Sequence, residues 1–212
     1  MMYSMEMIEK TIANLNKHNI KAVFIPTKDG LTELLAAYIK DGAIVSFGGS
    51  VTLSQTGMLD YLRNLEKQGK ICLLDRYREG LTADDIHQVF LDSFNADIYF
   101  ASSNAVTEDG FLFNADGNGN RVAAMIFGPK KVILIVGYNK IVPDLASANQ
   151  RLRTKAAPPN AQRLGLNTPC AQKGECRDCS SPSRMCCTYV TFGYQRDKEH
   201  LTVVIIGEEY GF

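Results

Sequence analysis

Six short runs of apolar residues recur along the chain, and most of them are separated by segments with helical periodicity. The runs cover residues 22–26, 43–47, 70–74, 97–102, 131–137 and 201–207. They are continuously apolar, a pattern typical of strands that are covered on both faces of a parallel sheet. Before the first run, Ile8, Ile12 and Leu15 recur at steps of three and four, which indicates a helix with one buried face, and similar patterns lie between later runs. This alternation predicts an α/β fold with an open, mainly parallel sheet and helices on both faces.

Two places interrupt the alternation. The dipeptide Asp109–Gly110 lies between the β-prone segments AVT and FLFN, which predicts a hairpin. Pro158–Pro159 predicts the end of a helix that begins after Asp144. No linker or repeat divides the chain, so we expect a single domain over residues 1–212, with a cysteine-rich loop at residues 169–187. The remaining cysteine, Cys72, lies in an apolar run and is expected in the core.

The charge and hydropathy of the sequence argue against some classes of binding partner. Lys plus Arg and Asp plus Glu number 23 each, so no basic excess indicates nucleic-acid binding. No run approaches the ~20 apolar residues that span a bilayer. The first residues do not have the pattern of a signal peptide. We therefore expect a cytoplasmic protein without membrane or nucleic-acid partners, in a compartment where thiols stay reduced. The sequence does not determine the oligomeric state, and it is compatible with a homo-oligomer.

The cysteine-rich loop carries the clearest chemical signal. Five of the six cysteines fall between Pro169 and Cys187, and one pair has the two-residue spacing that directs both sulfurs at one metal centre. An all-sulfur donor set favours zinc or an iron–sulfur cluster over magnesium or calcium. A redox disulfide involving Cys186 and Cys187 is the alternative, and either of these two cysteines can supply the fourth ligand. The expected metal ligands are Cys170, Cys176, Cys179 and Cys186.

Two glycine-containing loops are candidates for binding a small anion. The segment Gly48–Ser50 follows an apolar run, and ligands bind at the carboxyl ends of strands in open α/β sheets. The second loop, Asp116–Arg121, offers exposed amides and one cation, although it lacks the third glycine of the dinucleotide-binding fingerprint. Plain turns that need glycine for their backbone angles are the alternative. The expected ligand-binding residues are Gly48, Gly49, Ser50, Asn104, Thr107, Gly117, Asn118, Gly119, Asn120 and Arg121.

The turn TEDG, residues 107–110, contains the candidate catalytic residue Glu108. A carboxylate at this place could act as a base or as a nucleophile if a pocket shifted its pKa. The alternative is a solvated hairpin turn.

The segment SNAVTEDGFLFNADGNGNRVAAMIFGPKKVILIVGYNKIV closely resembles the signature of the LUD (lactate-utilisation) domain family. The segment PNAQRLGLNTPCAQKGECRDCSSPSRMCC is similar to the cysteine-bearing tail of a short, stand-alone branch of that family. The resemblance implies a fold like that of ribose-5-phosphate isomerase, glucosamine-6-phosphate deaminase and coenzyme A transferases. TEDG is also similar to the SENG turn in which coenzyme A transferases place a catalytic glutamate, here Glu108.

The resemblance also implies a function. Some LUD-family members take part in lactate oxidation within an iron–sulfur protein complex, and the long members carry two ferredoxin-type cysteine motifs that this sequence does not contain. The first hypothesis is a protein of lactate or organic-acid utilisation that binds an iron–sulfur cluster and acts in electron transfer or assembly with redox partners. The second is an enzyme for a small anionic metabolite, with structural zinc in the cysteine loop. The third is a metabolite-binding module without turnover.

Overall fold

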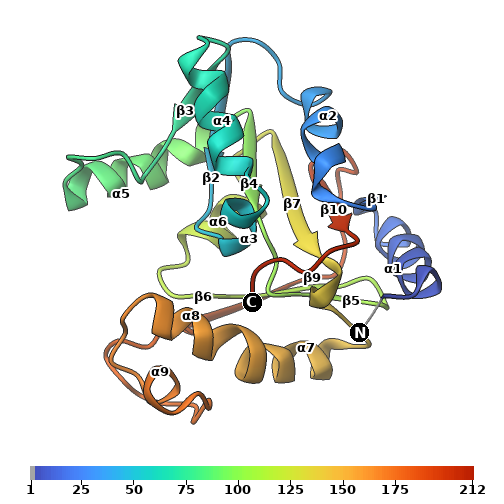
Figure 1. Ribbon diagram of the computed structural model, residues 1–212, viewed down its shortest axis with the longest axis vertical. Helices are drawn as coiled ribbons and strands as arrows, with labels where there is room; N and C mark the ends of the chain where they lie inside the picture. Colours follow the sequence, from blue (N-terminus) through green and yellow to red (C-terminus); the bar gives the residue numbers. More distant parts are fainter. Residues whose placement is uncertain (1–2) are drawn as a thin grey trace.

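The computed structural model of the protein describes residues 3–212, and its centre is a six-stranded sheet in which all neighbouring strands pair in parallel (Figure 1). The strand order is β1-β10-β7-β4-β2-β3. Each strand matches one of the six apolar runs to within a residue at either end, so the predicted α/β fold is confirmed. The strands are β1 (Lys21–Ile25), β2 (Ala43–Phe47), β3 (Ile71–Leu74), β4 (Ile98–Ala101), β7 (Lys131–Gly137) and β10 (Leu201–Ile206).

Helices cover both faces of this sheet and form two separate cores with it. One core packs α2 (Leu31–Ala36), α3 (Val51–Gln55) and α4 (Met58–Lys67) against the sheet. The other core lies between the sheet and helices α1 (Met5–Lys17) and α6 (Asn120–Ile126). Burying side chains on both faces explains why the central strands are apolar at most positions, with Ser46 and Thr202 as buried polar exceptions. Within residues 3–212, no helix has the length and apolar character needed to cross a membrane.

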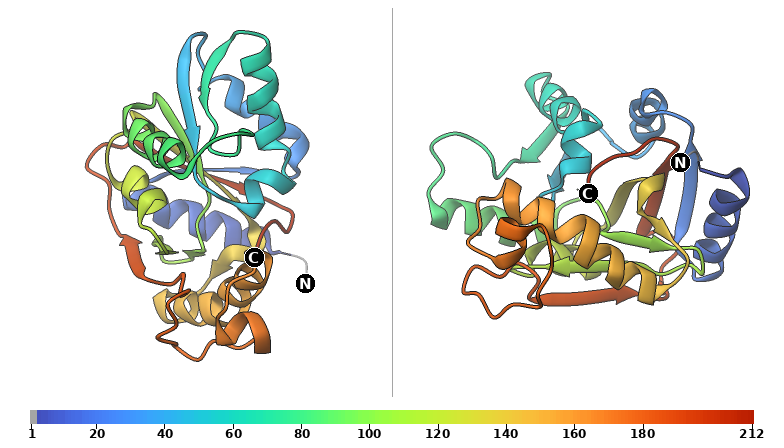
Figure 2. Two further views of the ribbon diagram at one scale, coloured as in Figure 1. Left: turned by 90° about the vertical axis from the view of Figure 1, so that its left-hand side faces the viewer. Right: turned by 60° about the horizontal axis from the view of Figure 1, so that its bottom comes forward.

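A second sheet lies across the carboxyl ends of the main sheet (Figure 2). Its order is β8-β5-β6-β9, and the antiparallel pair β5–β6 is the hairpin predicted around Asp109–Gly110. The prediction of one open sheet did not include this second layer, because short strands in one sequence do not show which sheet they join. The strands are β5 (Ala105–Thr107), β6 (Leu112–Asp116), β8 (Ile141–Val142) and β9 (Thr188–Phe192).

A helical segment covers the far side of the second sheet (Figure 1, orange). It runs without a break through α7 (Leu145–Arg151), a π-helical turn (Leu152–Ala156) and α8 (Ala157–Arg163). The prediction that Pro158–Pro159 ends the helix was therefore wrong. These prolines fall in the first turn of α8, after the wide turn has changed the hydrogen-bond pattern, and there a missing N–H group costs little.

Shorter elements complete the described chain. Helix α5 (Ala83–Asp92) begins with a capping box formed by Thr82 and Asp85, and α9 (Pro169–Lys173) opens the cysteine loop. Three 3₁₀ turns cover Lys28–Gly30, Ser93–Asn95 and Tyr138–Lys140. Cys72 is exposed, contrary to expectation. It lies on the edge strand β3 beside Ile44, which is also exposed, so the sheet is uncovered at this point.

Candidate anion-binding site and cysteine loop

A cavity of about 460 Å³ lies where the carboxyl ends of the main sheet meet the second sheet. Segments that follow β2 and β4 form one wall, and the end of β6 with its following loop forms another. The π-helical turn, α8 and residues Pro182–Met185 of the cysteine loop close the remaining sides. The cavity thus occupies the edge where open α/β sheets bind ligands, and it joins segments from most of the chain.

Among the charged side chains that line the cavity, basic ones predominate. Among the described residues, the lining includes one acidic side chain, Asp116, which is already paired with Arg121 at 3.3 Å between Oδ2 and Nε. Positive charge in excess of negative charge attracts small anions, and partial exclusion of water strengthens that attraction. The basic residues of the lining are Arg76, Arg121, Lys140, Arg163 and Arg184.

Arg121 holds the cavity wall together. Its Nη1 donates to Ser102 O and to Asn114 Oδ1, both at 2.8 Å. Its Nη2 donates to Ala115 O at 2.8 Å and to Asn104 Oδ1 at 3.3 Å. Burial lowers the pKa of Arg121, while the nearby Asp116 carboxylate opposes this change. Arg121 lines the cavity as expected, but its donors are engaged by the protein, so its main contributions are position and charge.

Lys140 is a buried amine in the cavity wall that the sequence did not suggest. Only 5% of the residue is exposed. Its Nζ donates to Thr52 Oγ1 at 2.8 Å, Ser102 Oγ at 3.0 Å and Ser103 O at 3.2 Å. Burial, and then repulsion from Arg151 and Arg121, lowers the pKa of Lys140 to about 7. Its place three residues after the apolar run 131–137 was the one signal in the sequence that could have identified it.

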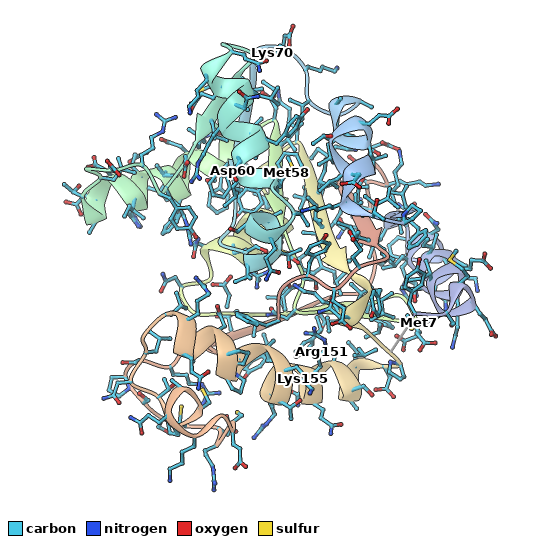
Figure 3. The ribbon with its side chains drawn as sticks, viewed as in Figure 1. Met7, Met58, Asp60, Lys70, Arg151 and Lys155 are labelled. Carbon is cyan, nitrogen blue, oxygen red and sulfur yellow. The ribbon has the colours of Figure 1, made fainter. Side chains whose placement is uncertain are left out.

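Arg151 is a second buried cation near Lys140, and it links α7 to segments that connect strands of the two sheets. Its Nη1 donates to Asn104 O at 2.7 Å and to Phe212 O at 3.1 Å, and its Nε donates to Asn139 O at 3.0 Å. Burial lowers the pKa of Arg151 to about 10. Figure 3 shows Arg151 on the side of the helical segment that faces the sheets. It therefore adds positive charge close to Lys140 in the cavity wall.

The glycines after β2 allow arginine side chains to lie against the backbone. A Cβ at Gly48 would lie 2.8 Å from Arg121 Cγ and 2.9 Å from Tyr99 Oη, and a Cβ at Gly49 would overlap Arg76. Gly49 and Ser50 line the cavity, whereas Gly48 is buried and outside the lining. Close approach therefore explains both glycines, but the group that approaches is a side chain of the protein.

The loop Asp116–Arg121 contributes most of its residues to the cavity. Gly117, Asn118 and Asn120 line it, together with Asn104 from the end of β4. Gly119 is outside the lining and has a φ of +80°, which a glycine adopts without strain at the start of α6.

Thr107 and Glu108 do not reach the cavity. Thr107 Oγ1 accepts from Phe111 N at 2.8 Å at the base of the hairpin. Glu108 Oε2 accepts from Lys10 Nζ at 2.9 Å, and Glu108 O accepts from Asn14 Nδ2 at 2.7 Å. Neither residue is part of the lining. The geometry thus links Glu108 to α1 and gives no support for its acting on a ligand in this cavity.

The cysteine loop brings four thiols into one neighbourhood. Burial, and then the nearby thiols of Cys176, Cys170 and Cys179, raises the pKa of Cys186 to about 11. Cys187 is exposed, and its Sγ donates to Arg184 O at 3.2 Å. In residues 3–212, no three His, Cys, Asp or Glu side chains are arranged to hold a metal ion.

Arg184 connects this loop with the cavity. Its Nη1 donates to Cys179 O at 2.6 Å, and its Nε donates to Cys186 O at 2.9 Å. Its Nη2 donates to Asp178 Oδ1 at 2.9 Å. Since Arg184 also lines the cavity, the loop that carries the thiols and the cavity wall are one continuous structure.

These features define an α/β protein with a cationic cavity at the carboxyl ends of a parallel sheet. The model of the LUD domain family matches residues 8–206, and the chain belongs to this family. The crystal structure of a DUF162 family protein from Deinococcus radiodurans has a similar fold, with a TM-score of 0.53 at 9% identity over 95% of this chain and 96% of that chain.

A second solved structure, eIF2B beta from Chaetomium thermophilum, aligns with a TM-score of 0.40 at 14% identity. That alignment covers 68% of this chain and 49% of the other. No curated protein matches the sequence significantly.

Proposed function

We propose that this protein binds a small anionic metabolite, such as an organic acid, in the cavity between its two sheets. The observation that carries this proposal is the lining, in which five basic side chains accompany one acidic side chain that is already paired. The cavity volume of about 460 Å³ lies in the range typical of small-molecule sites. Asn118 and Asn120 add polar groups that can orient a bound anion.

The test is titration calorimetry with a panel of small carboxylates and phosphates on the wild-type protein and on Arg163→Gln. Arg163 lines the cavity, and its Nη2 donates to Asn160 Oδ1 at 2.8 Å. We expect the substitution to weaken anion binding about tenfold, or ~1.4 kcal/mol, the lower end of the range for a charge-assisted hydrogen bond.

Lys155→Gln is the matched control for that experiment. Lys155 lies on the same helical segment, is exposed, and is not part of the cavity lining, so its charge should contribute little to binding. Equal losses in the two variants would point to a general surface effect and contradict the proposed site. Absence of binding across the panel would refute the proposal itself.

A second candidate function is metal binding by the cysteine loop. Four thiols without a nearby histidine suit an iron–sulfur cluster, and zinc is the alternative. Cys170, Cys176, Cys179 and Cys186 would hold the metal after the loop draws them closer together. A cluster would supply one-electron transfer next to the cavity, in keeping with a role in organic-acid oxidation or in assembly with redox protein partners. Such a thiol-rich site would suit the reducing cytoplasm.

Iron, zinc and acid-labile sulfide measured in protein purified without oxygen test this second candidate. We expect stoichiometric metal in the wild type, loss of metal in Cys186→Ala, and retention in Cys187→Ala because that thiol is exposed and bonds to Arg184 O. Cys72→Ala is a control for an exposed thiol outside the loop. Iron with sulfide supports electron transfer, and zinc alone supports a structural site. Protein without metal would refute metal binding.

A further inference from the structure

Lys140 is buried in the cavity wall, and the three hydrogen-bond partners of its amine include no acidic side chain. The three acceptors of its Nζ are two hydroxyl oxygens and one backbone oxygen, all of them uncharged. None of the salt bridges found in the described part of the chain includes this residue. Lysines are rarely buried unless they are paired, so this arrangement needs a reason beyond packing.

The surroundings of Lys140 favour the neutral amine. Removing an ammonium from water is unfavourable, and two further buried cations, Arg121 and Arg151, oppose its charge. The pKa of Lys140 is lowered to about 7, so a substantial fraction of the amine is neutral near neutral pH. A neutral amine is a nucleophile, and desolvation beside other cations is a known way to activate lysine.

The space around Nζ is compatible with an incoming molecule. Lys140 belongs to the cavity lining, as do Thr52 and Ser102, whose hydroxyl groups hold its nitrogen. Gly211 packs on the same amine with a φ of +69°, and a Cβ at that position would lie 3.1 Å from Nζ. A side chain at position 211 would therefore crowd both the amine and Thr52 Oγ1, and glycine avoids this overlap.

We propose that Lys140 forms a Schiff base with the carbonyl group of a small anionic aldehyde or ketone held in the cavity. This inference rests on the proposed function, because the cationic lining is what would bind the anionic part of the molecule. The cavity supplies the charge for the carboxylate or phosphate, and Lys140 supplies the nucleophile for the carbonyl carbon.

The step balances without an oxidant or a reductant. The Nζ lone pair attacks the carbonyl carbon to form a C–N bond, and the carbonyl oxygen takes up a proton to give a carbinolamine. Loss of the C–O bond then forms C=N and releases one water molecule that contains the carbonyl oxygen and both amine hydrogens. Thr52 and Ser102 can move protons between nitrogen and oxygen, because their hydroxyl groups both donate and accept.

The experiment is reductive trapping on the wild-type protein at pH 7 with sodium cyanoborohydride. Pyruvate is the carboxylate probe and glycolaldehyde phosphate is the phosphate probe. We expect at least one probe to add a single reduced adduct, which peptide mapping by mass spectrometry locates at Lys140. Labelling there should be at least ~10-fold faster than at any other lysine, because an ordinary lysine with a pKa near 10.4 is almost wholly protonated at pH 7.

Lys140→Met should lose this adduct, and Lys155→Met should keep it. If Lys140→Met does not fold, mapping of the wild-type protein decides by itself. Calorimetry with each probe in the absence of reductant measures anion binding separately from Schiff-base formation. Reversible binding without labelling at Lys140 would overturn the Schiff base and leave anion binding standing. Absence of both would overturn the proposed function as well. Labelling spread evenly over surface lysines would also overturn the inference.

Discussion

The buried amine of Lys140 should make the stability of the protein depend on pH in a specific way. Its pKa is lowered from 10.5 to about 7 in the folded state, a difference of about 3.5. At ~1.4 kcal/mol for each pH unit, protonation of Lys140 costs the folded state at most about 5 kcal/mol. Between pH 7 and 10.5 the unfolded chain binds more protons than the folded one, so this contribution makes the folded state more stable as pH rises.

The assay is urea-induced unfolding of the wild-type protein and Lys140→Met between pH 7 and pH 10. We expect the free energy of unfolding of the wild type to rise relative to the variant by several kcal/mol over this range. Comparing the two proteins cancels the titration of the other groups. Lys155→Met, which removes an exposed lysine, should keep a nearly constant difference from the wild type. A constant difference for Lys140→Met as well would refute the reasoning, because it would mean that Lys140 is as protonated in the folded state as in the unfolded one.

Two further predictions concern buried residues that support the cavity. Gly48→Ala should lower the free energy of unfolding by about 1–3 kcal/mol, because its Cβ would lie 2.8 Å from Arg121 Cγ. Gly30→Ala, with open space around its Cβ position and a φ of −77°, should leave urea denaturation nearly unchanged; equal effects would contradict this explanation. Arg151→Met should lower stability by roughly 2–4 kcal/mol, because Asn104 O and other buried acceptors lose their donor. A thermal denaturation curve that matches the wild type would show that these bonds contribute little.

The sequence predicted part of the candidate site because its loops have a recognisable composition. Glycine and asparagine at the ends of strands suggested the segments that now line the cavity, including Gly49, Asn104 and Asn118. The same reasoning proposed Arg121 as the cation of its loop. Arg121 does line the cavity, but its donors bind Ser102 O and Ala115 O of the protein itself. Composition shows which residues suit a ligand, but it does not show which of their atoms the protein itself uses.

Lys140, Arg76 and Arg163 were not predicted, although all three line the cavity. They come from three separate segments, and apart from the apolar run that precedes Lys140, nothing in their immediate sequence distinguishes them from ordinary surface residues. Glu108 shows the opposite case. Its turn resembled a catalytic motif, but the hairpin directs it toward Lys10 on α1. A charged side chain contributes to a binding site only when folding places it in a cavity, and the local sequence does not show where folding places it.

The sequence by itself determined the strands and the class of fold. Continuous apolar runs are stable only when both faces are covered, so their positions predicted the main sheet almost residue by residue. Tertiary structure alone decided the strand order, the second sheet and the uncovered edge at Cys72. It also decided that Lys140, the cysteine loop and the glycine loops line the same cavity. The physical reason is that periodicity encodes which face of an element is buried, whereas pairing between distant segments depends on packing over the whole chain.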